Sequence, residues 1–388
     1  MRGSVSDFST IVEISDRRRG IWSNGGMPQL ANGNAAVRAK AQAPPVTIMR
    51  SAPPAFDAAQ RAHFEAIAKE RLQAMRKNGQ VIANQVMPMS SHGFWDHAHS
   101  RGFEKVARGY AALLARPSER ESLEWWVVDE AKHIHRILYL NQWESHTAIA
   151  DLSAVAIWDF PRLEQLPKLV QRVELTRNHH SRSANQVTRR ARVEPEVVDL
   201  GGVLVTSIEQ TIVDVCCGAG PEAGLVIADF ALHNNLTDMD RLESLARAQG
   251  PRRGIRNFWA MARVADGRVE SPNESLMRWR FHAGGFEVPE SQVRIRYGRS
   301  ERRPDGFDAA SRTIYETDGK GKYSLHRAGI VEAFHDERER DAELEALGFR
   351  VLHMTWNDVQ NDIQFGEWCR RFKVFPTPAK RRTQRGKR

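Results

Sequence analysis

The stretch from residue 271 to residue 359 constrains the fold more than any other part of the chain, because helix and strand signals follow one another closely there. It opens on Ser-Pro-Asn-Glu at 271–274. A serine N-cap, a proline at the first helical position and a glutamate three residues after the serine predict a helix start, and a glycine pair at 284–285 predicts its end. The later signals predict the order αβββαβ, with the third strand marked least clearly, through strands at 292–297, around Tyr315 and at 349–355 and a charged helix at 335–347.

Acidic side chains gather around the middle strands of this stretch. Asp305 follows Pro304 at the end of a basic run, and the β-rich segment 313–318 carries Glu316 and Asp318. Side chains alternate along a strand, so Glu316 and Asp318 are expected on one face. A hairpin from Asp305 to Glu316 would bring three carboxylates onto one patch, and these repel one another unless a divalent cation neutralises them. The pattern therefore predicts Mg²⁺ at this patch, and with it phosphate chemistry.

Each of these acidic residues also has a simpler interpretation. Aspartate commonly starts a turn, so Asp305 and the Asp-Gly pair at 318–319 are compatible with ordinary turns. Asp308 is a rival to Asp305 as the metal-binding aspartate. Glu274 is accounted for by the capping box at the helix start, and His353 in the last strand is compatible with a packed histidine. The joint spacing within the αβββαβ order, rather than any single residue, favours the metal site.

Composition limits the class of protein. A chain of 388 residues predicts two or three domains, and 41% apolar with 27% charged residues is typical of a soluble protein with buried cores. Two aspartates interrupt the most apolar run, 148–160, and no run approaches the roughly 18–20 residues of a membrane span. The N-terminus lacks a signal-peptide pattern, and three cysteines make neither a disulfide framework nor a zinc site. We therefore expect no membrane partner and a cytoplasmic location.

The net charge of +9 comes from the C-terminal end. Residues 370–388 hold nine lysines and arginines and no acid, which leaves 48 of the 57 basic side chains against 48 acidic ones. A basic tail binds polyanions in a salt-dependent way, and Lys380, Arg381 and Arg382 are its candidate DNA contacts. A solvated end without a ligand explains the same charge equally well.

The sequence before the αβββαβ stretch divides into three segments. Residues 1–54 have few periodic apolar residues and much Gly, Asn, Ala and Pro, which predicts a disordered extension. Residues 55–116 predict a helix, a second short helix and a basic hairpin carrying Lys105 and Arg108. This is the order of a winged helix that binds DNA, although a small helical cap with a hairpin is the alternative. Residues 117–268 predict a mixed middle domain of helices and strands.

Basic side chains also line the predicted strands of the middle domain, at 169–175, 186–193 and 204–205. A basic strand edge facing phosphate is one interpretation, with Arg189 and Arg190 as candidate DNA contacts. A solvated hairpin is the other.

These motifs together resemble a known family. The resemblance is to the very-short-patch-repair (Vsr)-like endonuclease domain, a branch of the PD-(D/E)XK nuclease superfamily, and it is carried by Ser-Pro-Asn-Glu-Ser at 271–275, Arg-Pro-Asp at 303–305, Glu-x-Asp-Gly at 316–319 with Lys-Tyr at 322–323, and the ending from Asp341 to Asp358. Many actinobacterial proteins with this C-terminal domain also resemble the AbiEi type IV antitoxins and transcriptional regulators. Leu-Ser-Ala at 152–154, Thr-Ser at 206–207 and Thr-Ile-Val-Asp at 211–214 fit the AbiEi-like middle domain.

The resemblance implies a multidomain α/β protein with a DNA-directed role. We expect a winged helix at 55–116, the middle domain at 117–268, a restriction-endonuclease-like αβββαβ core at 269–365 and a basic tail at 366–388. Asp305 and Glu316 would be the motif acids that hold Mg²⁺, and Glu274 the acid often found on the first helix. The metal would activate a water for attack on a phosphodiester.

One residue departs from the superfamily pattern. The lysine that should stand two residues after the motif glutamate is Asp318 here, so Lys320 or Lys322 would have to reach back into the site. The alternative function is that of an AbiEi-type antitoxin or repressor, with a cognate toxin as partner and a catalytically degenerate nuclease fold.

Overall fold

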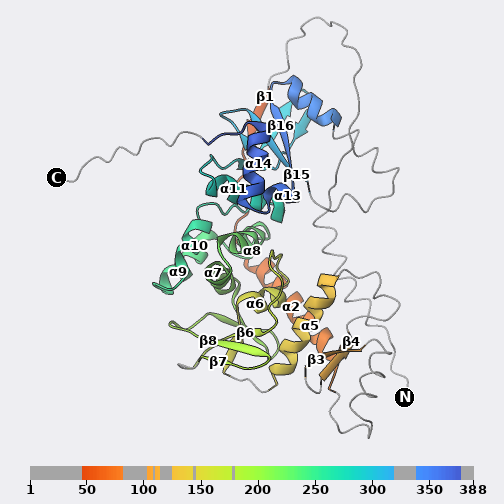
Figure 1. Ribbon diagram of the computed structural model, residues 1–388, viewed down its shortest axis with the longest axis vertical. Coiled ribbons are helices and arrows are strands. Elements are labelled where there is room, and N and C mark those ends of the chain that lie inside the picture. The colour runs from red at the N-terminus through yellow and green to blue at the C-terminus, as the bar shows by residue number, and fades with distance from the viewer. Residues whose placement is uncertain are drawn as a thin grey trace, which may run out of the picture. The chain divides into compact units, whose positions relative to one another are not determined.

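The computed structural model describes residues 46–81, 103–107, 110–113, 125–142, 146–176, 180–318 and 338–376. These residues form a mixed α/β protein (Figure 1). They divide into two compact units, one spanning Ala55–Arg263 and the other combining residues 46–54 with residues 264–376. The mixed α/β class with more than one unit, expected from the sequence, is therefore confirmed.

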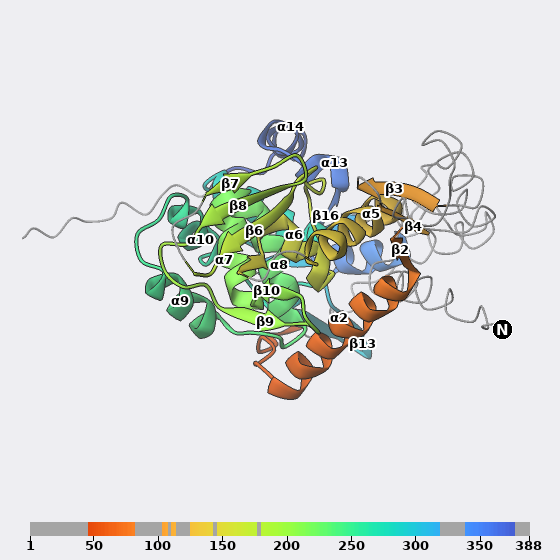
Figure 2. The same cartoon turned by 90° about the horizontal axis from the view of Figure 1, so that it is seen from below.

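The first unit contains two sheets and several helices. Its larger sheet has six strands in the order β7 (Ser181–Arg182), β8 (Gln186–Arg190), β6 (Val170–Glu174), β5 (Thr147–Ile149), β10 (Leu204–Thr206) and β9 (Val197–Asp199), seen from below in Figure 2. The helices are α2 (Ala58–Asn78), α5 (Trp125–Leu140), α6 (Asp151–Trp158), α7 (Ile208–Gly218), α8 (Pro221–His233), α9 (Met239–Ala248) and α10 (Ile255–Met261).

Helix α6 and a group of aromatic rings form the centre of this unit. Residues 153–158 of α6 are all buried, as expected for a helix that is apolar on every side. Phe64 of α2 stacks on Trp158 and Phe160, with 6.3 and 5.7 Å between ring centroids. The indole Nε1–H of Trp158 donates to the Thr206 carbonyl at 2.9 Å, so its one polar group is satisfied.

Part of the winged-helix segment lies among the described residues. Helix α2 covers the helix expected there, and β3 (Phe103–Ala107) pairs antiparallel with β4 (Tyr110–Leu113) as the expected hairpin. Strand β2 (Gly79–Val81) pairs with the other edge of β4 and completes a three-stranded sheet. The second short helix, expected near 93–100, lies outside the described residues.

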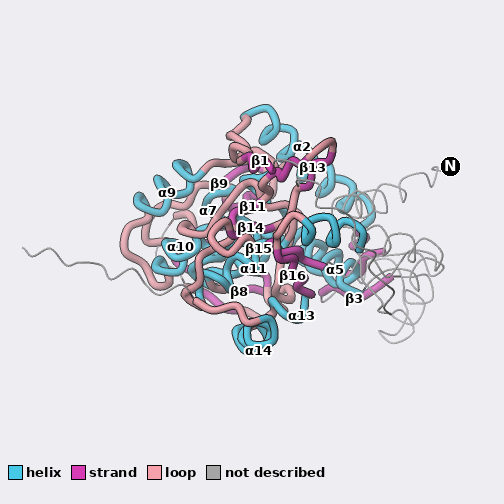
Figure 3. The backbone as a smooth tube through the Cα atoms, turned by 90° about the horizontal axis from the view of Figure 1, so that it is seen from above, coloured by secondary structure: helices cyan, strands magenta, loops and turns pink. Residues whose placement is uncertain are grey.

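The second unit is built on a four-stranded sheet of order β11 (Glu290–Ser291), β14 (Gly306–Asp308), β15 (Thr313–Asp318) and β16 (Arg350–Thr355), which follow one another in Figure 3. The first three strands are antiparallel neighbours, and β15 and β16 are parallel. A smaller sheet has the order β1 (Val46–Met49), β12 (Arg294–Tyr297) and β13 (Ser300–Arg302). The helices are α11 (Pro272–Ala283), helical residues 338–346, α13 (Trp356–Val359) and α14 (Asp362–Phe372).

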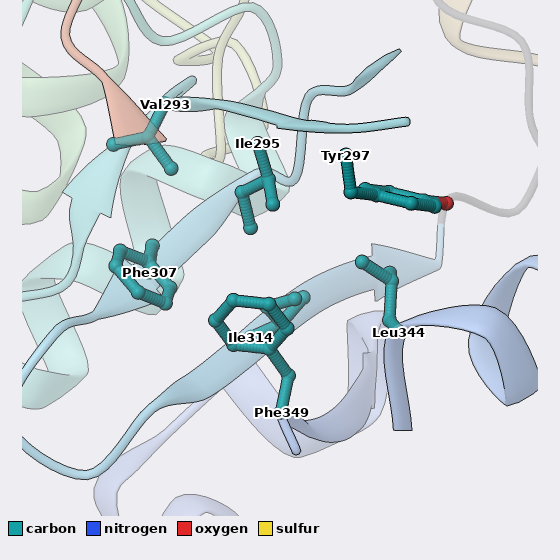
Figure 4. Close-up of a cluster of buried hydrophobic side chains, with 7 residues drawn as sticks. All are labelled: Val293, Ile295, Tyr297, Phe307, Ile314, Leu344 and Phe349. Atoms are coloured by element: carbon teal, nitrogen blue, oxygen red, sulfur yellow. The ribbon is translucent and has the colours of Figure 1, made fainter. Parts of the chain in front are cut away.

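Alternation along β15 gives the four-stranded sheet two packed faces. Ile314 belongs to a buried cluster on one face, drawn in Figure 4 with Val293, Ile295, Tyr297, Phe307, Leu344 and Phe349. Its neighbour Tyr315 points to the other face, where its ring lies 4.9 Å from Phe281 of α11 and 6.3 Å from Trp368 of α14. By the same alternation Glu316 and Asp318 extend the row of Ile314 toward the end of the strand.

Two segments that were expected to lack structure belong to this unit. Residues 46–49, inside the predicted extension 1–54, form β1, which pairs antiparallel with β12. Residues 366–372, the start of the predicted basic tail, are part of α14, whose Phe365 and Trp368 are buried. Both predictions were wrong at these residues. The partner of β1 is far away in sequence, so local composition does not reveal it, and the apolar residues of α14 recur at helical spacing among arginines that suggested a tail.

Candidate functional site

Asp305 connects two strands of the four-stranded sheet. Its Oδ2 accepts hydrogen bonds from the backbone N–H and the hydroxyl of Thr317, at 2.8 and 2.7 Å. Thr317 stands between Glu316 and Asp318 in β15, so these hydrogen bonds hold the half-buried Asp305 carboxyl against that strand. Burial raises the pKa of Asp305 despite the two hydrogen bonds, and the charges of Glu270 and Asp318 raise it further.

The structure distinguishes Asp305 from its rival, Asp308. Asp308 accepts hydrogen bonds from the Ala310 backbone N–H at 2.9 Å and the Ser311 hydroxyl at 2.6 Å, which is the local pattern of an aspartate that stabilises a turn. Asp305 instead binds a residue twelve positions away on another strand. The turn interpretation therefore applies to Asp308, and Asp305 remains the candidate ligand.

Glu316 is close enough to Asp305 for the two charges to interact. Burial raises its pKa well above the ordinary value, and the Asp305 carboxylate raises it further. The charge of His353 and a hydrogen bond from the Asp305 backbone N–H act in the opposite direction. Both candidate metal ligands are half-buried rather than fully buried.

Glu274 is the most deeply buried acid of the group, at 3% exposure. Its backbone N–H donates to the Ser271 side chain at 3.2 Å, which confirms the predicted helix start. Its carboxyl Oε2 accepts from the Glu270 backbone N–H at 3.2 Å and from the Gln292 amide at 2.8 Å. Burial and the charge of Asp305 outweigh these hydrogen bonds and raise the pKa of Glu274 to about 8.

Two buried amide side chains border the acids, and sequence reasoning missed both as site residues. Gln292 has a φ of 53°, a region that favours glycine, and its Oε1 has no hydrogen-bond donor among the described residues. The amide of Asn273 donates to the Asp318 carbonyl at 3.0 Å, and its Oδ1 likewise finds no donor in the described part of the chain. Such buried acceptors cost roughly 1–3 kcal/mol each unless a donor or cation satisfies them.

Asp318 faces a histidine on the neighbouring strand. His353 of β16 is the ladder partner of Glu316, and its Nδ1 lies 3.6 Å from Asp318 Oδ1 while its Nε2 lies 2.9 Å from Asp341 Oδ2. Burial alone lowers the pKa of His353, but the two carboxylates overcome this effect and raise it to about 10. His353 is thus a cation held between two acids rather than the packed histidine that its sequence position suggested. Lys320 and Lys322 lie outside the described residues.

The donor atoms of this site suit a hard cation. Among the described residues no group of three or more His, Cys, Asp or Glu side chains is arranged to hold a metal ion. Mg²⁺, however, usually takes only one or two carboxylates and keeps several waters. Asp305 and Glu316 supply two carboxylates, and the unsatisfied amide oxygens supply neutral acceptors nearby, so the chemistry of the donors fits Mg²⁺.

The predicted DNA contact Arg189 has a different role. From β8, it donates to Asp151 Oδ2 at 3.1 Å and binds the fully buried Asp214, which also pairs with Arg252 at 2.8 Å. A guanidinium that neutralises two carboxylates inside its own domain is not free to bind phosphate, so the structure contradicts that prediction. The spacing of arginines along the sequence does not distinguish a DNA contact from an internal ion pair, because the acidic partners of Arg189 lie on other elements, α6 and α7.

The other predicted DNA contacts are located only in part. Arg190 is exposed at the end of β8, and Lys105 lies on β3. Arg108 and the tail residues Lys380, Arg381 and Arg382 lie outside the described residues.

Comparison with known proteins adds no relative. No family model matches the chain, and neither a curated protein nor a solved structure matches it significantly. No helix in the described part of the chain is long and apolar enough to cross a membrane.

Proposed function

We propose that this protein acts on DNA and that its second unit is a Vsr-like, PD-(D/E)XK endonuclease-like core that hydrolyses phosphodiester bonds with Mg²⁺. The topology supports the proposal. Helix α11 precedes three antiparallel strands, helical residues 338–346 follow, and β16 then pairs in parallel with β15. The proposal takes β11, β14 and β15 as the three strands of the αβββαβ core, whereas β12, which covers the strand expected at 292–297, lies in the smaller sheet with β1 and β13.

One observation carries the proposal. The charge of Asp305 raises the pKa values of two acids from separate elements, Glu274 of α11 and Glu316 of β15, so Asp305 is the neighbour that both share. Carboxylates held together in this way repel one another when ionised, and this repulsion destabilises the fold. A divalent cation would turn the repulsion into ligation.

Each residue has a defined task in this proposal. Asp305 and Glu316 would hold Mg²⁺, which when bound supplies an activated water and stabilises charge on the leaving oxygen. Thr317 orients Asp305 through two hydrogen bonds. Gln292 fixes Glu274 at the buried side of the group. His353, the ladder partner of Glu316 on the neighbouring strand, places a positive charge beside that glutamate.

The test is cleavage of supercoiled and of mismatched DNA by the purified protein with Mg²⁺ or Mn²⁺. We expect Asp305→Ala and Glu316→Ala to lose cleavage, while Asp308→Asn, which changes a turn aspartate in the same hairpin, keeps it. Absence of cleavage by the unaltered protein, or equal cleavage by Asp305→Ala, would remove the enzymatic proposal.

The second candidate function is that of an AbiEi-type antitoxin or transcriptional repressor. It is favoured by the acid at position 318, which pairs with His353 where a catalytic lysine is expected. In that case the nuclease fold is catalytically degenerate, a winged helix at 55–116 provides DNA binding, and a cognate toxin is the partner. DNA binding without cleavage, lost on deletion of residues 55–116 but kept on trimming residues 377–388, would favour this function.

A further inference from the structure

An arginine-rich hairpin precedes the Asp305 site in the sequence. Strands β12 and β13 with the turn between them, extended to Arg303, form what we call the arginine hairpin, residues 294–303. These ten residues include five arginines and a single acid, Glu301. Asp305 follows only two residues after the hairpin ends.

The hairpin is a rigid platform with one apolar and one charged face. Val293, Ile295 and Tyr297 alternate into the buried cluster, as Figure 4 shows. Arg294 and Arg296 therefore project from the opposite face, where their side chains are 50% and 56% exposed. Because the apolar face is packed and the ladder with β13 is regular, these guanidinium groups are presented from a fixed backbone.

The arginines of the hairpin fall into two classes. Arg302 and Arg303 each have an acidic partner elsewhere in the unit, Glu343 at 2.9 Å and Glu270 at 2.7 Å. Arg294 and Arg296 share the single Glu301, at 3.6 and 2.8 Å. Arg299 is exposed on the turn and forms no ion pair with any described residue. The exposed face and the turn together therefore carry three guanidinium groups against one carboxylate.

Fold stability does not explain this excess of positive charge. Exposed ion pairs contribute about 0–1 kcal/mol, and one carboxylate cannot neutralise three arginines. Arginine presents a planar fork of donors that matches phosphate oxygens, and it binds them in pairs. A row of such groups just before Asp305 in the sequence fits a ligand with repeated phosphates.

We propose that the exposed face of the arginine hairpin, formed by Arg294, Arg296 and Arg299, binds the phosphate backbone of duplex DNA beside Asp305. The inference rests on the proposed DNA-directed function and adds the surface that positions the strand. Duplex DNA, rather than an anionic membrane, is the ligand because the hairpin ends two residues before Asp305 and a duplex presents a regular row of phosphates.

The experiment measures binding of a fluorescent duplex to the full chain in EDTA, over a range of salt concentrations. The triple variant R294A/R296A/R299A is expected to lower the salt slope by about 1 for each lost phosphate contact. That change weakens binding by on the order of a hundredfold at about 0.1 M salt. The matched control, R247A/R253A/R256A, removes three exposed charges from the first unit and should leave the slope near that of the unaltered protein.

A second variant guards against loss of folding as an explanation. Glu301→Gln releases Arg294 and Arg296 from their shared acid, so it should tighten binding and steepen the salt dependence, which a damaged fold would not do. An unchanged salt slope for DNA binding by the triple variant, or an equal loss of DNA affinity in the control variant, would overturn the inference. So would a triple variant that loses binding to phosphatidylserine vesicles but binds the duplex as well as the unaltered protein does.

The outcome is separable from that of the nuclease proposal. If the unaltered protein binds DNA through the hairpin but does not cleave it with Mg²⁺, the inference stands and the enzymatic proposal fails. If cleavage occurs but the triple variant binds as well as the unaltered protein, the reverse holds.

Discussion

Replacing Glu274 by glutamine should stabilise the second unit, and the gain should depend on pH. The carboxyl is 3% exposed, and burial and Asp305 hold its pKa at about 8, against 4.5 for the ordinary side chain. A raised pKa in an acid means that the folded state keeps the proton more tightly than the unfolded state. The free energy of unfolding is therefore unaffected below about pH 4.5 and falls as the pH rises toward 8.

The size of the effect follows from the two pKa values. One pKa unit corresponds to about 1.36 kcal/mol, so the difference between 4.5 and 8 costs the folded state about 5 kcal/mol above pH 8 and about 3 kcal/mol at pH 7. Glutamine has the shape of the protonated acid and no charge, so Glu274→Gln should recover those amounts. The new side chain keeps an oxygen that accepts from the Glu270 N–H and the Gln292 amide.

Calorimetry in EDTA at pH 4, 7 and 9 measures the predicted difference. At pH 7 the transition of the second unit should move up by roughly 10 °C, with no shift at pH 4 and a larger one at pH 9. Glu287→Gln makes the same chemical change at an exposed position and should have little effect at any pH. A Glu274→Gln protein that is less stable than the unaltered chain at pH 7, or equally stable throughout, would show that the buried carboxyl is not under the repulsion described above.

Three further predictions concern the first unit. Arg189→Met should lower the free energy of unfolding of this unit by about 3–5 kcal/mol, measured in urea, because Asp214 would lose one of its ion-pair partners. Unchanged stability would contradict a structural role for Arg189 and leave it as a candidate DNA contact. Burial lowers the pKa of His133 to about 3, so between pH 6.5 and 3 only the unfolded chain takes up the proton. Acidification over this range should therefore lower the free energy of unfolding by about 1.4 kcal/mol for each step of one in pH. His133→Asn should flatten this part of the calorimetric pH profile. Gly254→Ala should cost about 1–3 kcal/mol, because φ is +82° and a Cβ would lie 2.2 Å from the Cys217 carbonyl oxygen; an unchanged melting temperature would contradict this.

The local signals in the sequence were sufficient where short-range chemistry decides the structure. The Ser-Pro-Asn-Glu motif places the start of α11 at Pro272, and the Ser271 side chain caps it as expected. Alternation along 313–318 gives β15 its two faces. The sequence left Asp308 as a rival to Asp305 for the metal, and hydrogen bonds across the sheet were needed to separate them.

The sequence by itself determined the start of α11, the strands β15 and β16 and the position of the acidic residues on them, since N-caps, glycines and strand alternation act over a few residues. Only the tertiary structure decided how those acids are used. It placed Asp341 and Asp318 on either side of His353, buried Gln292 against Glu274, added β1 to β12 and directed Arg189 toward Asp214. Each of these contacts joins residues from separate elements, and ion pairing and burial depend on distance in space, which spacing along the chain does not encode.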